Sequence, residues 1–183
     1  MKGFDGGKKM KREETKIIEQ VLYGNLFGTN PKLAKEYGTE EVTIGFARGG
    51  RINNKIEIVD FLSYDMKKDL FRCFEIKVSM SDFKSKAAKS WQGNYNYLVL
   101  SEELYHQRPL DWWKNNVPKY VGIMVVNTVS RFHFVAKRPV FQQITEERKD
   151  VLKKSLLRTL FYQKVRICKT KEELGSGSTE MEV

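Results

Sequence analysis

The chain has few of the features that mark membrane-spanning, secreted or zinc-binding proteins. No apolar run approaches the roughly 20 residues that a helix needs to cross a bilayer. Residues 1–14 lack the apolar segment and cleavage site of a signal peptide. The two cysteines, Cys73 and Cys168, and the two histidines, His106 and His133, are too widely spaced for a zinc motif. We therefore expect reduced thiols and a location in the cytoplasm.

Composition and charge favour a single folded domain with an anionic partner. Of the 183 residues, 40% are hydrophobic and 12% are aromatic, which is enough for a substantial core. The net charge is +10 and the isoelectric point is near 9.5. Cationic surfaces attract nucleic acid by releasing condensed counterions, so we expect a nucleic-acid partner and no membrane. On charge alone, the alternative is a basic protein without a nucleic-acid role. The sequence also leaves open whether the chain forms a homodimer or binds a host protein.

The order of expected elements predicts an α/β or α+β sandwich with a mixed sheet and a C-terminal helix. Apolar periodicity and turn residues predict helices at 11–27, 82–91, 101–105 and 145–165, and strands at 41–46, 55–64, 70–79, 95–100, 120–126 and 131–137. The stretch before the first strand reads as a loop, and 47–54 as a hairpin turn. The domain limits are then a flexible basic arm at 1–11, one domain at 12–166 with a core at about 41–126, and a disordered tail at 167–183.

Two of the expected strands carry an acid among apolar residues. Asp60 lies among isoleucines and leucines in the second strand, and Glu75 lies between Phe74 and Ile76 in the third. Burying an ionised carboxylate costs several kcal/mol unless it is paired or bound to a metal. Two such acids on neighbouring strands therefore indicate either a functional site or a buried salt bridge.

Lys77 follows Glu75 by two residues and therefore points to the same side of the strand. An acid followed after one residue by lysine occurs five times in the chain, but only Glu75 lies inside an apolar strand. Two carboxylates on adjacent strands suit a divalent cation, and the lysine beside them suits an attacking water or a phosphate. The alternative from the same residues is an ion pair of Lys77 with Glu75 or Asp60.

The segments IEIVDFLSY, FRCFEIKVSMSDF and NYNYLVLSEELY resemble the PD-(D/E)xK nuclease superfamily, and more narrowly its MmcB-like phage and bacterial proteins. The resemblance covers about residues 41–126 and implies an αβββαβ core. It also implies a Mg²⁺-dependent deoxyribonuclease, with Mn²⁺ as a substitute, that acts in DNA repair, recombination or processing. A non-catalytic protein that keeps this fold and binds nucleic acid or inhibits a host system is the alternative. Val59 stands where the family often has proline.

Carried over by position, the resemblance makes Asp60 and Glu75 metal ligands, adds the Ile76 carbonyl as a ligand and gives Lys77 the catalytic lysine's role. A further acid is expected upstream, and the candidates are Glu14, Glu19 and Glu41. Gln92 is either a supporting polar residue or a loop glutamine. Phosphate contacts are expected from the helix at 82–91, unless its lysines form only a solvated face; they are Lys84, Lys86 and Lys89. Core packing is expected for Tyr97, whereas Trp112 and Trp113 are open to base stacking.

Overall fold

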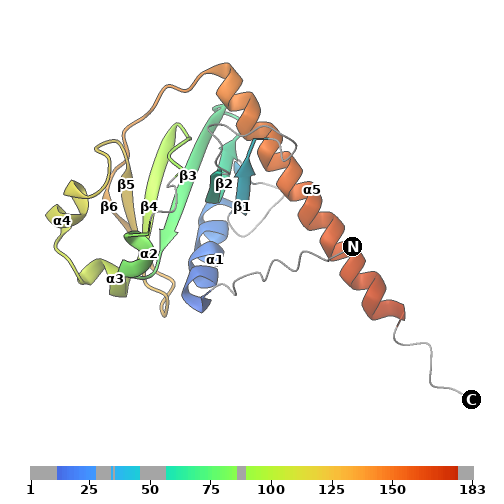
Figure 1. The fold of residues 1–183 in the computed structure, drawn as a ribbon, viewed down its shortest axis with the longest axis horizontal. Helices are drawn as coiled ribbons and strands as arrows, with labels where there is room; N and C mark the ends of the chain where they lie inside the picture. Colours follow the sequence, from blue (N-terminus) through green and yellow to red (C-terminus); the bar gives the residue numbers. More distant parts are fainter. Residues whose placement is uncertain (1–11, 28–33, 35, 46–56, 86–89, 177–183) are drawn as a thin grey trace, which may run out of the picture.

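The computed structural model describes residues 12–27, 34, 36–45, 57–85 and 90–176. It is an α+β fold built on one six-stranded mixed sheet with a long C-terminal helix, as the element order predicted (Figure 1). The helices are α1 (Glu13–Phe27), α2 (Met80–Phe83), α3 (Glu102–His106), α4 (Leu110–Asn115) and α5 (Glu146–Ser176). The strands are β1 (Glu36–Ile44), β2 (Glu57–Asp65), β3 (Leu70–Lys77), β4 (Tyr95–Ser101), β5 (Gly122–Val126) and β6 (His133–Lys137).

Sheet order follows chain order from β1 to β6. The first three strands form an antiparallel meander, and β6 is antiparallel to β5 at the far edge. The pairs β3–β4 and β4–β5 are parallel, so the chain must cross from the end of β3 to the start of β4. That crossover contains α2 and passes beside the carboxyl end of β3 (Figure 1).

Apolar side chains pack on both faces of the sheet. On one face, Phe74 and Ile76 of β3 pack with Ile18 and Leu22 of α1. On the other face, a cluster under α5 gathers β1, β2 and the start of β3, while a second cluster gathers β4 and β5 around Trp113. Alternation along β3 places Glu75 and Lys77 on this second face, between the two clusters. One acid, Glu75, and one basic residue, Lys77, therefore lie between two apolar clusters.

The first strand begins at Glu36, so the loop predicted before residue 41 is wrong for residues 36–40. Gly38 lies inside this strand. A β-carbon at Gly38 would collide with the backbone of Leu62 and Ser63 on β2. The glycine therefore permits close approach of two strands, which is one reason for glycine in a strand.

The helix predicted at 82–91 is also wrong in its limits. Helix α2 spans Met80–Phe83, Lys84 caps its end, and Ser90 and Trp91 are not helical. The Ser90 N–H donates to the Glu75 carboxylate, so it is not available to a helical carbonyl. The hydroxyls of Ser101 and Thr145 cap α3 and α5, because each accepts a backbone N–H three residues later.

Helix α5 continues to Ser176, so the tail predicted from residue 167 is wrong for residues 167–176. The apolar face ends near residue 165, but the lysines and glutamates that follow are good helix formers. Four predicted features lie outside the described residues: the arm at 1–11, the hairpin turn at 47–54, the sites Lys86 and Lys89, and the tail at 177–183.

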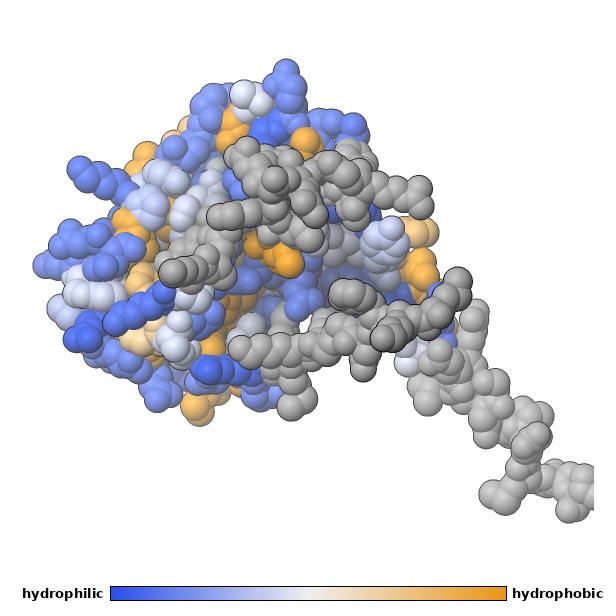
Figure 2. Space-filling model, viewed as in Figure 1, coloured by the Kyte–Doolittle hydropathy of each residue, from blue (hydrophilic) through white to orange (hydrophobic). Residues whose placement is uncertain are grey.

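Hydrophilic side chains cover much of the face seen in Figure 2, with apolar residues in separate small areas. Among the described helices, none has a stretch both long and apolar enough to cross a membrane. The long helix α5 carries many charges, including Lys153, Lys154 and Arg158.

Candidate metal centre

The site forms where two strands of the sheet separate. Pairing between β2 and β3 runs from Asp65↔Leu70 to Phe61↔Phe74 and stops there. Beyond that point β2 continues alongside β1, while β3 continues alongside β4 as far as Lys77. The first residue of β2 past the last pair is Asp60, and the first of β3 is Glu75. Both acids therefore lie at the opening between the two strands.

Asp60 takes over part of the interrupted ladder. Its Oδ2 accepts the backbone N–H of Ile76 at 2.8 Å, in place of a carbonyl of β2. In an extended strand the N–H and C=O of one residue point to the same side, so the Ile76 carbonyl faces the same opening. The opening thus gathers a carboxylate and a backbone carbonyl from neighbouring strands.

The strand pair β1–β2 is irregular at the same level. Its register places Glu41 opposite Asp60, between the pairs Glu40↔Phe61 and Val42↔Val59, and Glu41 has a positive φ of 53°. Val59 and Leu62 both pack under α5, although regular alternation would place them on opposite faces. Left-handed backbone at a glutamate is uncommon and concentrates at functional sites and tight structural constraints. The alternation of β2 side chains between the two faces of the sheet is therefore interrupted at the level of Asp60.

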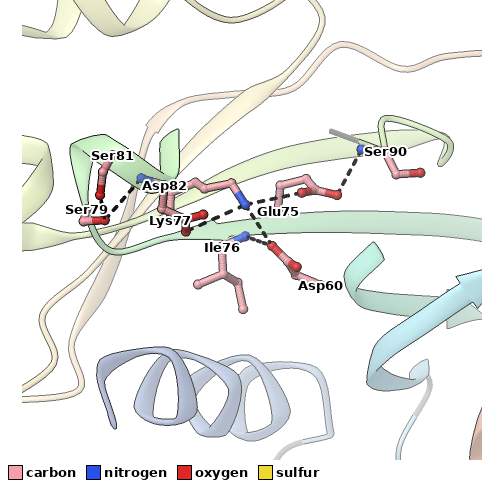
Figure 3. A network of polar contacts seen from close by, with 8 residues as sticks. All are labelled: Asp60, Glu75, Ile76, Lys77, Ser79, Ser81, Asp82 and Ser90. Atoms are coloured by element: carbon pink, nitrogen blue, oxygen red, sulfur yellow. Dashed lines mark hydrogen bonds and ion pairs between the residues drawn. The ribbon is translucent and has the colours of Figure 1, made fainter. Parts of the chain in front are cut away.

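Lys77 reaches into this opening and contacts both acids. Its Nζ lies 3.4 Å from Asp60 Oδ2 and 3.7 Å from Glu75 Oε2. Figure 3 shows the Lys77 ammonium facing both carboxylates, with the Ile76 N–H directed at Asp60. The Lys77 side chain is 9% exposed, that of Glu75 3% and that of Asp60 34%. Solvent therefore reaches the group from the side of Asp60.

Burial and charge perturb the pKa values of two of these groups. Burial, and then the nearby Asp60 carboxylate, raises the pKa of Glu75 to about 8. Burial disfavours the charged form of Lys77, but the carboxylates around it outweigh that effect and raise its pKa. One ammonium does not offset the two carboxylates, so the apo site favours a protonated Glu75 near neutral pH. A divalent cation would relieve this imbalance.

Two contacts of the site were not predicted from the sequence. The Ser90 N–H donates to Glu75 Oε1 at 3.0 Å, which holds one oxygen and leaves Oε2 toward Lys77. Asp82 Oδ2 lies 4.0 Å from the Lys77 Nζ as a third carboxylate. The sequence holds a signal for Asp82, since the turn after β3 places residues 80–83 beside the lysine.

The upstream acids do not complete the site in the described part of the chain. Glu14 and Glu19 lie on α1 and Glu41 lies on β1, with Glu19 buried and Glu41 exposed. Among the described residues, no group of three or more histidine, cysteine, aspartate or glutamate side chains gathers so that it could hold a metal ion. The oxygen set is therefore Asp60, Glu75 and the Ile76 carbonyl.

The other candidate polar residues are either exposed or contact residues other than Asp60, Glu75 and Lys77. Gln92 donates to Glu57 Oε2 at 3.1 Å, near the start of β2, and the same carboxylate lies 3.9 Å from Arg148 of α5. Lys84 is exposed at the end of α2. His106 pairs at 4.0 Å with Glu102, and His133 contacts Asn25, so neither belongs to the site.

The aromatic candidates for base stacking differ in exposure. Trp113 is fully buried, and its indole N–H donates to the carbonyls of Tyr105 and Arg108. Tyr97 is partly buried and stacks on Phe74 with ring centroids 5.1 Å apart, so the predicted packing role is confirmed. Trp112 is partly exposed, and the Arg108 guanidinium lies over its ring, 5.6 Å from the centroid.

The donor set fits a magnesium ion in its chemistry. Mg²⁺ prefers oxygen ligands and keeps several waters, so two carboxylates and a carbonyl are a sufficient protein contribution. Burial first, and then the Asp60 carboxylate, raises the pKa of Glu75, and a cation held by the two acids would favour its charged form. The ammonium of Lys77 stands between the two acids, so a cation there requires the lysine to move.

Comparison with known proteins yields a likeness of fold. No protein-family model matches the sequence, and no curated protein shows significant similarity to it. One similar solved structure is that of a protein of unknown function from Silicibacter pomeroyi. It is 16% identical, with a TM-score of 0.54 over 84% of this chain and 92% of that chain. At this level of identity the likeness concerns the fold alone.

Proposed function

We propose that the chain is a Mg²⁺-dependent DNA nuclease of the PD-(D/E)xK type. The observation that carries the proposal is the convergence of Asp60 and Glu75 on the ammonium of Lys77, at the opening where β2 and β3 separate. Metal-dependent hydrolysis of a phosphodiester can use two acids to hold the metal and a cation near the attacked phosphate, and here these groups come from adjacent strands. We place the activity in DNA repair, recombination or processing in a bacterium or phage-infected cytoplasm.

The order of elements supports the proposal. The expected nuclease core has a helix, three strands, a helix and a strand; here α1, β1 to β3, α2 and β4 follow in that order. The first three strands are antiparallel and β4 is parallel to β3. The acids and the lysine therefore lie on the two strands that a restriction-endonuclease-like core would use.

Each residue has a separate task in the proposed mechanism. Asp60, Glu75 and the Ile76 carbonyl would hold the ion. When bound, Mg²⁺ polarises the phosphate and lowers the pKa of a coordinated water. Ser90 holds one oxygen of Glu75 through its N–H and so fixes the direction of the other. Lys77 orients the attacking water or stabilises charge on the phosphate, and it stays protonated because its pKa is raised.

The charge of the chain suits a nucleic-acid substrate. The net charge of +10 favours a polyanion, and Lys84 is exposed at the end of α2, close in the chain to the site. A phosphate contact by Lys84 would position DNA without reading its sequence.

The test is a cleavage assay on single-stranded, duplex and branched DNA with Mg²⁺ or Mn²⁺. Wild-type protein should nick or cut at least one substrate, and Lys77→Ala should abolish cutting while the fold persists in circular dichroism. Lys114→Ala is the matched control, since Lys114 is another lysine paired with an aspartate, at 3.2 Å, but on α4. If all three forms of DNA stay uncut with both metals, the proposed nuclease activity is wrong.

A second candidate function is DNA binding or inhibition of a host system without catalysis. It is favoured by one observation: among the described residues no group of three or more histidine, cysteine, aspartate or glutamate side chains is arranged to hold a metal ion, and Lys77 already contacts both Asp60 and Glu75. This function predicts salt-sensitive DNA binding that Lys77→Ala leaves unchanged, with no cleavage. The same assay therefore separates the two candidates.

A further inference from the structure

We propose that Asp82 is a positioning residue that receives the ammonium of Lys77 when a divalent cation binds between Asp60 and Glu75. The inference rests on the proposed metal site and assigns a regulatory movement to it. It is carried by the arrangement of three carboxylates around one buried lysine, at 3.4, 3.7 and 4.0 Å from its nitrogen.

The need for movement follows from charge. The Lys77 Nζ is in contact with one oxygen of Asp60 and one of Glu75, so an ion held by both acids would lie beside the ammonium. A dication and an ammonium repel each other strongly in a buried site, where screening by water is weak. The lysine must therefore leave the space between the two acids, and it does so at least cost toward another anion.

Asp82 is placed to be that anion. Figure 3 shows its carboxylate on the other side of the Lys77 ammonium from Glu75. Its side chain is 46% exposed, compared with 3% for Glu75, so it lies toward solvent. A small change of side-chain torsions in Lys77 would exchange the two inner carboxylates for Asp82. The lysine would then stand beside the ion, where an incoming phosphate would meet it.

The backbone at Asp82 is held on both sides. The Ser79 hydroxyl accepts the Asp82 N–H at 3.3 Å as the N-cap of α2. The next residue, Phe83, is buried against Trp112 and Trp113. A carboxylate on a fixed backbone, still half open to solvent, is suited to receive a moving charge. Helix α2 has four residues, so interaction with a helix dipole is a weak alternative reason for the acid.

A double-mutant cycle on Mn²⁺ affinity, measured by titration calorimetry without DNA, tests the inference. Asp82→Asn should weaken Mn²⁺ binding about fivefold in the wild-type background, which is the size of a typical coupling between contacting residues. In the Lys77→Met background, where no ammonium needs a place, Asp82→Asn should change affinity by less than about twofold. Asp82→Glu should retain most of the wild-type affinity.

Asp111→Asn is the control, because Asp111 also pairs with a lysine at 3.2 Å but lies on α4. Equal weakening by Asp82→Asn in both backgrounds would show direct attraction of the ion and overturn the inference, and so would no weakening in either. Lys77→Gln replaces Lys77→Met if the methionine variant does not fold. If wild-type protein binds no Mn²⁺, the proposed metal site fails and the inference fails with it; binding with additive effects overturns the inference alone.

Discussion

Asp60 of β2 accepts the backbone N–H of Ile76 of β3 at 2.8 Å, just past the last paired residues of the two strands. A side chain thus replaces a backbone carbonyl at the point where the sheet divides. The same oxygen also contacts Lys77, at 3.4 Å. Asp60 therefore has two roles: it completes the hydrogen bonding of the sheet, and it supplies negative charge to the site. Different substitutions of Asp60 separate these two roles.

Asp60→Ala should destabilise the fold more than Asp60→Asn. The alanine leaves the Ile76 N–H without its acceptor, which costs about 1–3 kcal/mol for a buried group. The asparagine keeps an amide oxygen for this N–H and loses only the charge. Urea denaturation of both variants without metal measures the difference. Equal midpoints for the two would show that the Ile76 hydrogen bond contributes nothing measurable.

Glu75 should make the apo protein less stable as pH rises from about 4.5 to about 8. Burial and the nearby Asp60 carboxylate raise its folded-state pKa to about 8 from an ordinary value of 4.5, so the unfolded state loses its proton first. The stability due to this group is full below pH 4.5 and is lost through pH 8. Glu75→Gln removes the titration, so its free energy of unfolding should fall less over this range, by roughly 1–4 kcal/mol.

Denaturant titrations at several pH values between 4.5 and 8.5 measure this effect. Glu103→Gln is the matched control, since Glu103 is exposed on α3 and should follow the wild-type curve. Parallel curves for wild type and Glu75→Gln would mean that burial does not perturb Glu75.

Trp113 and Trp112 should respond differently to alanine. Trp113 is fully buried with both indole contacts satisfied, so Trp113→Ala should cost about 3–5 kcal/mol of stability. Trp112 is partly exposed, so Trp112→Ala should cost less and leave a folded protein for DNA-binding assays. Thermal unfolding compares the two. A larger loss for Trp112 would contradict the assignment of Trp113 to the core.

The strands were predictable from the sequence because their alternation is strong. The acids Asp60 and Glu75 stood out as polar residues in apolar strands, and the structure brings both to Lys77. Contacts made by the crossover after β3 were not predictable. Asp82 and Ser90 reach the site through a turn and a backbone N–H, which leave no periodic pattern. The loop predicted at residues 36–40 was wrong for a related reason. Gly38 permits a close approach of two strands, which depends on a partner distant in the chain.

The central claim is that Asp60 and Glu75 form a metal site rather than a structural ion pair with Lys77. Calorimetric titration of the wild-type protein with Mn²⁺ at pH 8 tests it most directly. The account predicts saturable binding of the metal that Asp60→Asn and Glu75→Gln each abolish, that Glu103→Gln leaves unchanged and that Lys77→Met strengthens. No binding to the folded wild-type protein, or binding that survives both acid substitutions, would contradict it.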